Sequence, residues 1–321
     1  MLVSKKKGFI FEDNNQQHFT LAQPKISFLT VNFNQPEVTL DLLNSLVKLE
    51  SQDWECIVVD NGSAASSLEE DVKAFPKVKF LRSDENLGFA GGNNIGLALC
   101  EGEYIFLINN DTELPADFLN ELIPFVDNST NLGALSPRII YHDEPDLIQY
   151  AGSTEMNKVT IRSFGVGFRE KDQGQYNDIR KTPFTHGAAM LVPRKVLDIV
   201  GPMREDYFLY YEELDWCERI RQAGFDIWYY GPTFLWHKES VSTGRNSPFK
   251  TYYVNRNRLL FARRNYDAKT RVLNYLYYSF IALPKNILSF LLKGEVQQAK
   301  AFWRGYIYNL THKSSAHADR Y

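Results

Sequence analysis

From residue 26 onward, the chain alternates short apolar runs with longer segments whose apolar residues recur at helical spacing. The apolar runs predict strands at residues 26–31, 54–60, 78–81 and 104–111. Helices are predicted between them, at residues 38–49, 68–75 and 92–100. Strands that alternate with helices in this way pair side by side in parallel. We therefore expect an α/β fold with a mostly parallel central sheet and helices on both faces.

Length and composition are those of an ordinary globular protein. The chain has 321 residues, of which 44% are apolar and 23% are charged, as in soluble domains. This length suits one large domain with an extension, or two domains. The net charge of −3 gives no global basic field for binding nucleic acid. Three widely spaced cysteines predict neither a zinc site nor a disulfide framework, which favours a reducing cytoplasm.

Neither end of the sequence predicts a membrane-crossing segment. The basic residues Lys5 to Lys7 are followed by polar residues, not by the apolar core of a signal peptide. The most apolar C-terminal stretch, residues 272–292, is interrupted by Pro284 and Lys285. Its uninterrupted part is shorter than the ~20 apolar residues that a transmembrane helix needs. We expect a cytoplasmic protein without a transmembrane helix.

The fourth predicted strand ends abruptly in Asn109, Asn110 and Asp111. Hard divalent cations take oxygen ligands, and ligands of open α/β sheets bind outside the carboxyl ends of the strands. A carboxylate at this point is placed to hold a metal against a diphosphate. The alternative is an ordinary Asn/Asp turn after a strand.

Two other predicted strands end in similar residues, at the same edge of a parallel sheet. Asn32 and Asn34 follow the first strand, and Asp60 and Asn61 follow the second. Asp60 is suited to accept hydrogen bonds from a nucleobase imide or a ribose hydroxyl. The alternative for Asp60 is a turn residue or a helix N-cap.

A glycine- and asparagine-rich segment spans residues 85–96 and contains Asn86, Gly88, Phe89 and Asn93. Glycines let the backbone approach a ligand, and the start of the following helix favours anions. The segment is not the dinucleotide-binding fingerprint, because it does not follow the first strand. The alternative is a flexible loop.

Acidic residues gather at the start of a predicted helix at residues 210–223. They are Glu212, Glu213 and Asp215, and one of them is a candidate general base. The alternative is simple complementation of the helix dipole by acids.

Downstream, His237 ends an apolar run and is a candidate metal ligand as a neutral imidazole. A structural role is the alternative for a lone histidine. Further on, Arg245 is placed to reach a phosphate.

Together these motifs resemble those of bacterial family 2 glycosyltransferases of the GT-A fold, in the rhamnosyltransferase-like branch. The matching segments come in the family's order over about residues 25–260, at residues 30–34, 58–63, 86–93, 107–112, 187–190, 211–215 and around His237.

The resemblance implies a nucleotide-diphosphate sugar donor, a Mg²⁺ or Mn²⁺ cofactor, and transfer with inversion at the anomeric carbon. Residues 109–111 stand where the family has its Asp-x-Asp motif, with Asn109 in place of the first acid. Asp111 then becomes the main metal carboxylate, with His237 and Asn109 as further expected metal ligands. The residues expected to bind the donor are Asn32, Asn34, Asp60, Asn61, Asn86, Gly88, Phe89, Asn93, Asn110, Asp111 and Arg245.

Glu213 matches the second acid of the family's Glu-Asp pair, its presumed catalytic base. Glutamate in place of aspartate lengthens the arm by one methylene group. Glu212 and Asp215 therefore remain alternatives to Glu213 for this role.

The expected organisation is an N-terminal extension (residues 1–24), a GT-A domain (25–260) and a helical C-terminal extension (261–321). The GT-A domain divides into a nucleotide-binding half (25–112) and an acceptor-binding half (113–260). The C-terminal region mixes aromatic and basic residues. It forms either helices packed on the catalytic domain or a surface that sits on the inner leaflet and reaches a lipid-linked acceptor.

Two rival functions predict different features. A nucleotidyltransferase of the same fold needs a basic, glycine-rich loop after the first strand, but residues 32–36 contain neither Gly nor Lys. A non-catalytic nucleotide-sugar or glycan-binding module needs no acid pair at residues 212–213. By resemblance alone, the favoured donor is dTDP-rhamnose, with UDP-linked galactofuranose, GlcNAc or glucose left open. The expected acceptor is a cell-envelope glycan or a lipid-linked saccharide, and the sequence predicts no oligomeric state.

Overall fold

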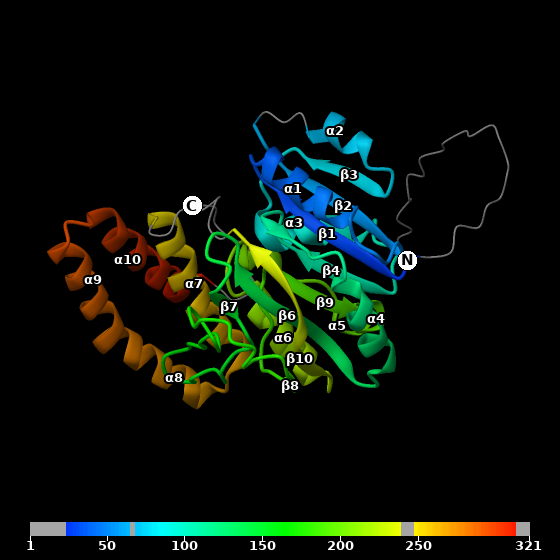
Figure 1. Ribbon diagram of the computed structural model, residues 1–321. Helices are drawn as coiled ribbons and strands as arrows, with labels where there is room; N and C mark the ends of the chain where they lie inside the picture. Colours follow the sequence, from blue (N-terminus) through cyan, green and yellow to red (C-terminus); the bar gives the residue numbers. More distant parts are fainter. Residues whose placement is uncertain (1–23, 65–67, 239–246, 313–321) are drawn as a thin grey trace, which may run out of the picture.

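The computed structural model describes residues 24–64, 68–238 and 247–312 (Figure 1). Its centre is a sheet in the order β3-β2-β1-β4-β9-β6-β10-β5. The four strands predicted from the sequence lie side by side and are parallel: β1 (Ile26–Asn32), β2 (Trp54–Asn61), β3 (Val78–Ser83) and β4 (Tyr104–Ile108). All eight residues of β2 are buried, as expected for a parallel strand that is covered on both faces.

The second half of the sheet is mixed. Next to β4 lies β9 (Ala189–Pro193), which is antiparallel to β4 and to β6 (Leu132–Tyr141). The strand β10 (Asp226–His237) is parallel to β6 and antiparallel to the short strand β5 (Thr112–Glu113). Two further short strands, β7 (Ile148–Tyr150) and β8 (Ile179–Lys181), pair with β6 and β10. The sheet is therefore parallel through the predicted half and antiparallel at β9.

Helices cover both faces of the sheet and bury two separate apolar clusters. One face carries α1 (Pro36–Leu46), α2 (Leu68–Asp71) with the 3₁₀ turn η1 (Val72–Ala74), and α4 (Phe118–Asn128). The other face carries α3 (Gly88–Leu97), α5 (Arg194–Val200) and α6 (Glu212–Gln222). This arrangement confirms the expected α/β fold.

Some boundaries differ from those predicted. The helix α3 begins at Gly88 rather than near residue 92, because side chains outside the helix bind the backbone at its start. Asn61 Oδ1 accepts from the backbone N–H of Leu87 at 2.9 Å, and Asn86 Oδ1 accepts from that of Gly88 at 2.8 Å. The strand β4 ends at Ile108, so residues 109–111 form a turn at the sheet edge.

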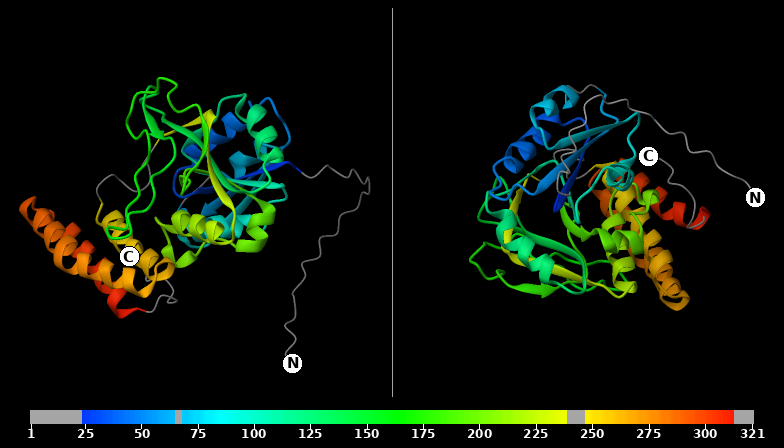
Figure 2. Two further views of the ribbon diagram at one scale, coloured as in Figure 1. Left: turned by 90° about the horizontal axis from the view of Figure 1, so that it is seen from below. Right: turned by 90° about the vertical axis from the view of Figure 1, so that its right-hand side faces the viewer.

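The C-terminal region is helical, as expected. It comprises α7 (Pro248–Asn265), α8 (Ala268–Tyr277), the π-helical turn η3 (Tyr278–Ala282), α9 (Leu283–Leu292) and α10 (Val296–Thr311). In Figures 1 and 2, α8 and α9 run away from the sheet as an arm, and α10 returns from its end to pack on α7. Within the described ranges, no helix is long and apolar enough to cross a membrane.

Candidate active site

A cavity of about 720 Å³ lies at the carboxyl edge of the parallel strands. The start of α3, the start of α6 and the first turn of α7 complete its wall. Ten of the residues singled out in the sequence line it, namely Asn61, Asn86, Gly88, Phe89, Asn109, Asn110, Asp111, Glu212, Glu213 and His237. Asn32, Asn34, Asp60, Asn93 and Asp215 do not line the cavity. Arg245 lies outside the described residues.

Asp60 is fully buried behind the wall. Its Oδ1 accepts hydrogen bonds from Asn32 Nδ2 at 3.0 Å and from the Ser63 hydroxyl, and its Oδ2 lies 3.3 Å from Arg82 Nη1. Asn32 Oδ1 in turn accepts from the Thr39 hydroxyl at 3.1 Å. Asp60 and Asn32 thus tie the ends of β1 and β2 together, and a ligand contact of Asp60 would require this network to open.

Asn34 and Asn93 also act on the protein's own backbone. Asn34 has a positive φ of 56° and accepts a hydrogen bond from the N–H of Ala64 at 2.9 Å, which joins the loops after β1 and β2. Asn93 is buried and donates to the carbonyl of Phe89 at 2.9 Å within α3.

Gly88 brings the start of α3 against the loop before α6. Its φ is +73°, and a Cβ atom built on it would lie 2.3 Å from the carbonyl oxygen of Phe208. Only glycine tolerates both conditions. The same carbonyl accepts from the N–H of Phe89 at 2.7 Å. The glycine therefore fixes the distance between the two parts of the cavity wall.

His237 and Asp111 form the polar centre at the end of β4 and β10. Both are buried, and His237 Nε2 lies 3.0 Å from Asp111 Oδ1. On the other side of the ring, Nδ1 lies 2.7 Å from Gln149 Oε1. Because a carbonyl oxygen only accepts hydrogen bonds, Nδ1 carries the proton of the neutral imidazole. The lone pair of Nε2 is then on the side of Asp111, where Asn109 Nδ2 also lies 3.3 Å from Nε2.

This arrangement fits a bound cation. A ring nitrogen with a lone pair and a carboxylate oxygen repel each other unless a proton or a metal ion lies between them. Asp111 Oδ1 is buried and accepts no hydrogen bond from a described residue. A separation of 3.0 Å allows both atoms to bind one divalent ion, whose ligands lie about 2.0–2.2 Å away. Among the described residues, no group of three His, Cys, Asp or Glu side chains is placed to share a metal, so further ligands would be amide oxygens, ligand atoms or water.

The motifs did not include three neighbours of this centre. Gln149 lies on β7, and Lys250 lies in the first turn of α7. His186 precedes β9, and its Nδ1 accepts from the N–H of Ala188 at 3.1 Å. Burial and the adjacent ring of His237, partly offset by Asp111, lower the pKa of His186 to about 3. His186 is therefore a neutral ring in the cavity wall at neutral pH.

The acid pair lies at the first turn of α6. Glu212 is buried, Glu213 is half-buried, and Oε2 of each has no hydrogen-bond partner among the described residues. Burial raises the pKa of Glu213. Burial and the adjacent charge of Glu213 raise the pKa of Glu212 well above its usual value. Because two close carboxylates do not both ionise readily and the pKa of Glu212 is raised further, Glu213 is the first of the pair to lose its proton.

A strained loop carries this pair. Phe208, Tyr210 and Tyr211 have positive φ angles of 64°, 70° and 74°, which are costly for large side chains. The loop is held from α7, where Asn257 Nδ2 donates to the carbonyls of Tyr207, Leu209 and Tyr210 at 2.8, 2.8 and 2.7 Å. The neighbouring Arg256 donates to the carbonyl of Tyr207 at 2.8 Å. The C-terminal region thus supports the active-site wall directly.

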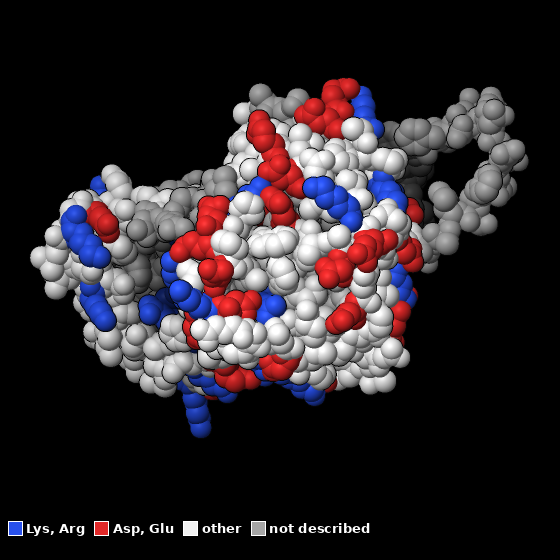
Figure 3. All heavy atoms as spheres, viewed as in Figure 1, with Lys and Arg blue, Asp and Glu red and all other residues white. Residues whose placement is uncertain are grey.

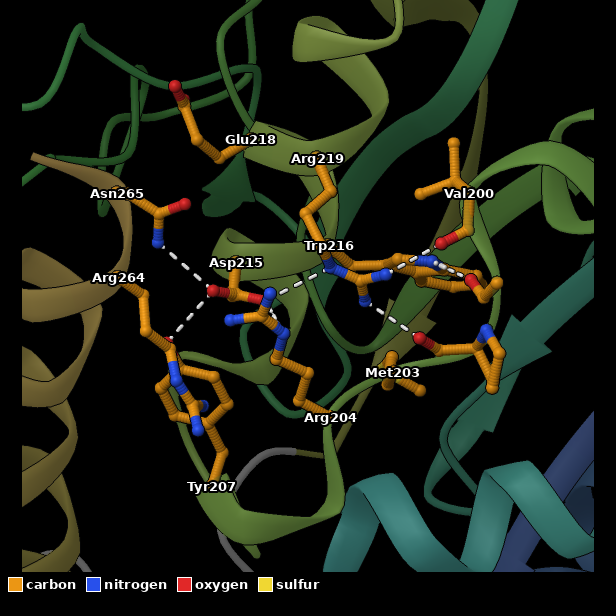
Figure 4. Close-up of polar contacts among 12 residues, drawn as sticks. Val200, Met203, Arg204, Tyr207, Asp215, Trp216, Glu218, Arg219, Arg264 and Asn265 are labelled. Carbon is orange, nitrogen blue, oxygen red and sulfur yellow. Dashed lines mark hydrogen bonds and ion pairs between the residues drawn. The ribbon is translucent and has the colours of Figure 1, made fainter. Parts of the chain in front are cut away.

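Asp215 is engaged elsewhere, as Figure 4 shows. It is fully buried, and its Oδ1 accepts from the Tyr207 hydroxyl and from Asn265 Nδ2, both at 3.0 Å. Its Oδ2 pairs with Arg219 at 3.2 Å and with Arg204 at 3.6 Å. Both oxygens of Asp215 are bound outside the cavity. Of the three acidic residues at the start of α6, a ligand in the cavity can therefore reach Glu212 and Glu213.

Known proteins resemble this chain in sequence and in fold. Residues 27–200, more than half of the chain, match the family model described as glycosyl transferase family 2. The chain is 24% identical over 277 residues to the low-salt glycan biosynthesis hexosyltransferase Agl10 of Haloferax volcanii, and the match covers 85% of this chain and 86% of that protein. It is 27% identical over 276 residues to the dTDP-rhamnosyl transferase RfbF of Shigella flexneri, covering 78% of this chain and 87% of that protein.

Among solved structures, the fold resembles that of GalNAc-T7 crystallised with UDP, GalNAc and Mn²⁺. The TM-score is 0.60 at 14% sequence identity, and the match covers 84% of this chain and 60% of that chain. The family model, the relatives and the fold agree with one another. The chain belongs to glycosyl transferase family 2 and is a glycosyltransferase with the GT-A fold.

Proposed function

We propose that this glycosyltransferase moves a sugar from a nucleotide-diphosphate donor to an acceptor hydroxyl by direct displacement with inversion. The observation that carries the proposal is the presence of two different pairs of titratable residues in one cavity. Asp111 and His237 form a cation site at one edge, and Glu212 and Glu213 form an acid pair at another. The first pair would hold a cation that stabilises the charge on a diphosphate leaving group. The second pair would take the proton of an attacking hydroxyl.

Asp111 and His237 would hold a Mg²⁺ or Mn²⁺ ion, with Asn109 beside them. When bound, such an ion offsets the charge that develops on the departing diphosphate. Gln149 would keep the proton of His237 on Nδ1, and Nε2 would then act as a ligand once Asn109 Nδ2, which lies 3.3 Å from it, gives way to the ion. The crystallisation of GalNAc-T7 with UDP and Mn²⁺ supports this assignment.

Glu213 is the proposed general base. It is the first of the pair to lose its proton, because the pKa of Glu212 is raised further by burial and by the charge of Glu213. It takes the proton of the acceptor hydroxyl as the oxygen attacks the anomeric carbon and the bond to the diphosphate breaks. No covalent intermediate is needed, so one base is sufficient.

For the donor we favour dTDP-rhamnose, and RfbF, a relative that covers most of the chain, supports this choice by its name. Asn61, Asn86 and Phe89 form the part of the wall that would contact the nucleoside. The proposed acceptor is a cell-envelope glycan or a lipid-linked saccharide, used at the inner face of the cytoplasmic membrane.

A donor-consumption assay tests the proposal. The protein is incubated with dTDP-rhamnose, UDP-GlcNAc or UDP-galactofuranose, with Mn²⁺ or EDTA, and with a cell-envelope lipid extract as acceptor. We expect acceptor-dependent release of dTDP in Mn²⁺ and a product of inverted anomeric configuration by NMR. A product with the configuration of the donor would contradict the direct displacement.

A further inference from the structure

The C-terminal arm concentrates the exposed apolar side chains of this protein. Of the 17 large hydrophobic residues exposed in the described part of the chain, 11 lie between residues 268 and 311. They are Val272, Leu273, Leu276, Phe280, Ile281, Leu288, Leu291, Leu292, Val296, Trp303 and Leu310. Soluble proteins rarely expose apolar residues in such a cluster unless the surface binds something.

These residues lie on consecutive elements of the arm, which comprises α8, η3, α9 and α10. The elements α8, η3 and α9 follow one another without a break from residue 268 to residue 292. In α8 and η3, the buried residues Asn274, Tyr278 and Ala282 recur every four positions. The helix α9 has no buried residue, and Phe280 and Leu292 are 75% and 79% exposed. We call the surface formed by the 11 exposed residues the arm face.

An apolar groove extends the arm face between α9 and α10. Its volume is about 450 Å³, and its wall includes Leu283, Ile287, Leu291, Val296 and Trp303. Lys300 lies at its edge. A groove with this lining suits acyl chains or other flexible apolar groups.

The charge of the arm is opposite to that of the whole chain. Residues 268–311 contain six basic residues, Lys269, Arg271, Lys285, Lys293, Lys300 and Arg304, and one acidic residue, Glu295. The net charge of the full chain is −3. In Figure 3, basic side chains prevail on the visible part of the arm, whereas both signs are mixed over the sheet domain.

We propose that the arm face docks on an anionic lipid surface. An apolar helical face flanked by basic residues binds at the interface of a membrane, since apolar side chains enter the acyl boundary and basic side chains attract anionic headgroups. A second copy of the chain is a poorer occupant, because it would place two sets of six cations against each other. No described helix is long and apolar enough to span a membrane.

The arm face is connected to the active site through α7. The first turn of α7 contributes Ser247, Phe249 and Lys250 to the cavity wall, and α10 packs along the same helix. Docking would therefore hold the cavity at a fixed place relative to the lipid surface. This placement of the cavity matters only under the proposed function, in which the acceptor is lipid-linked or membrane-bound. The docking of the arm face on lipid does not depend on the proposed function.

Vesicle flotation of the full-length protein tests the proposal. We use vesicles of phosphatidylcholine with and without phosphatidylglycerol. The wild type should float with the anionic vesicles much more than with the neutral ones, and salt should weaken this binding. The double variant Phe280→Glu/Leu292→Glu should bind the anionic vesicles at least roughly tenfold more weakly than the wild type. The variant Lys293→Glu/Lys300→Glu should also lose binding to these vesicles.

The matched control is Phe164→Glu/Ile199→Glu, at residues that are 64% and 65% exposed outside the arm. It should float like the wild type. Wild-type protein that stays unbound with anionic vesicles, or a Phe280→Glu/Leu292→Glu variant that binds as well as the wild type, would overturn the proposal. A third result would also overturn the proposal: wild-type protein that binds no vesicles but forms a dimer without lipid, which Phe280→Glu/Leu292→Glu dissociates. The arm face would then bind a second copy of the chain.

The flotation assay contains no donor sugar, so its failure leaves the proposed glycosyl transfer untouched. Conversely, donor consumption with a soluble acceptor analogue needs no lipid. Phe280→Glu/Leu292→Glu should keep wild-type turnover in that assay.

Discussion

His237 Nε2 lies 3.0 Å from Asp111 Oδ1, although the two residues are distant in sequence. The antiparallel pairing of β10 with β5 sets His237 opposite Thr112 and so beside Asp111. The backbone adds to this contact, since the N–H of Lys238 donates to the carbonyl of Asp111 at 2.8 Å. Sheet register thus brings together the two residues of the proposed cation site.

Gln149→Leu should weaken metal affinity without removing a ligand. Its Oε1 accepts from His237 Nδ1, and loss of such a partner typically lowers metal affinity or activity by roughly 10–100-fold. We expect the Mn²⁺ concentration for half-maximal turnover to rise by about this factor. Turnover as a function of Mn²⁺ measures the effect, with Gln173→Leu, at an exposed position, as the control. An unchanged Mn²⁺ dependence would contradict the role of Gln149.

Glu213→Gln should remove most turnover and keep donor binding. The amide retains the shape of the carboxylate but takes up no proton, and a positioned general base contributes roughly 10²–10⁴-fold. Donor affinity is measured by calorimetry and turnover by dTDP release. The control is Glu218→Gln on the same helix, whose carboxylate pairs with Arg221 and does not line the cavity. Near-normal turnover of Glu213→Gln would assign the base elsewhere.

His186 should make the protein sensitive to acid. Its pKa is about 3 in the folded state, below the ordinary histidine value of 6.5. The folded state therefore binds fewer protons, so the stabilising effect of neutral His186 is complete above pH 6.5 and is lost as the pH falls towards 3. His186→Gln should flatten the fall of Tm across this interval, measured by calorimetry. A slope equal to that of the wild type would refute this.

Asn257→Ala should loosen the loop that carries the acid pair. It leaves the carbonyls of Tyr207, Leu209 and Tyr210 without this donor, and an unsatisfied buried group costs about 1–3 kcal/mol. We expect a lower free energy of unfolding in urea and a larger loss in kcat than in donor affinity. Asn128→Ala, at an exposed residue that donates to the carbonyl of Pro124, should change neither quantity much. Equal losses in kcat and donor affinity would argue against a role in positioning the base.

The sequence predicted the parallel half of the fold and most of the strand-end residues of the site. The reason is physical, since uninterrupted apolar runs report burial on both faces and the polar residues that end them meet at one edge. The same logic placed Asn61, Asn109, Asp111 and His237 in the cavity wall.

The missed residues reach the site through non-local pairing. Gln149 lies on a strand of three residues, and His186 precedes β9, which enters the sheet antiparallel next to β4. No local periodicity reports such neighbours. Nor does spacing decide between Glu212, Glu213 and Asp215, which all lie in the first turn of α6. Both carboxylate oxygens of Asp215 are bound by Tyr207, Arg219 and Asn265, outside the cavity.

Calorimetric titration of dTDP tests the proposed metal-assisted nucleotide-sugar site at Asp111 and His237. The proteins are the wild type and Asp111→Asn, each with Mn²⁺ and with EDTA. We expect Mn²⁺ to strengthen dTDP binding to the wild type by at least roughly tenfold, because an ion held by Asp111 would also attract the diphosphate. In Asp111→Asn this gain should disappear, while the weak binding in EDTA stays the same. Equal dTDP affinity of the wild type with Mn²⁺ and with EDTA would contradict a metal-assisted nucleotide-sugar site at Asp111 and His237.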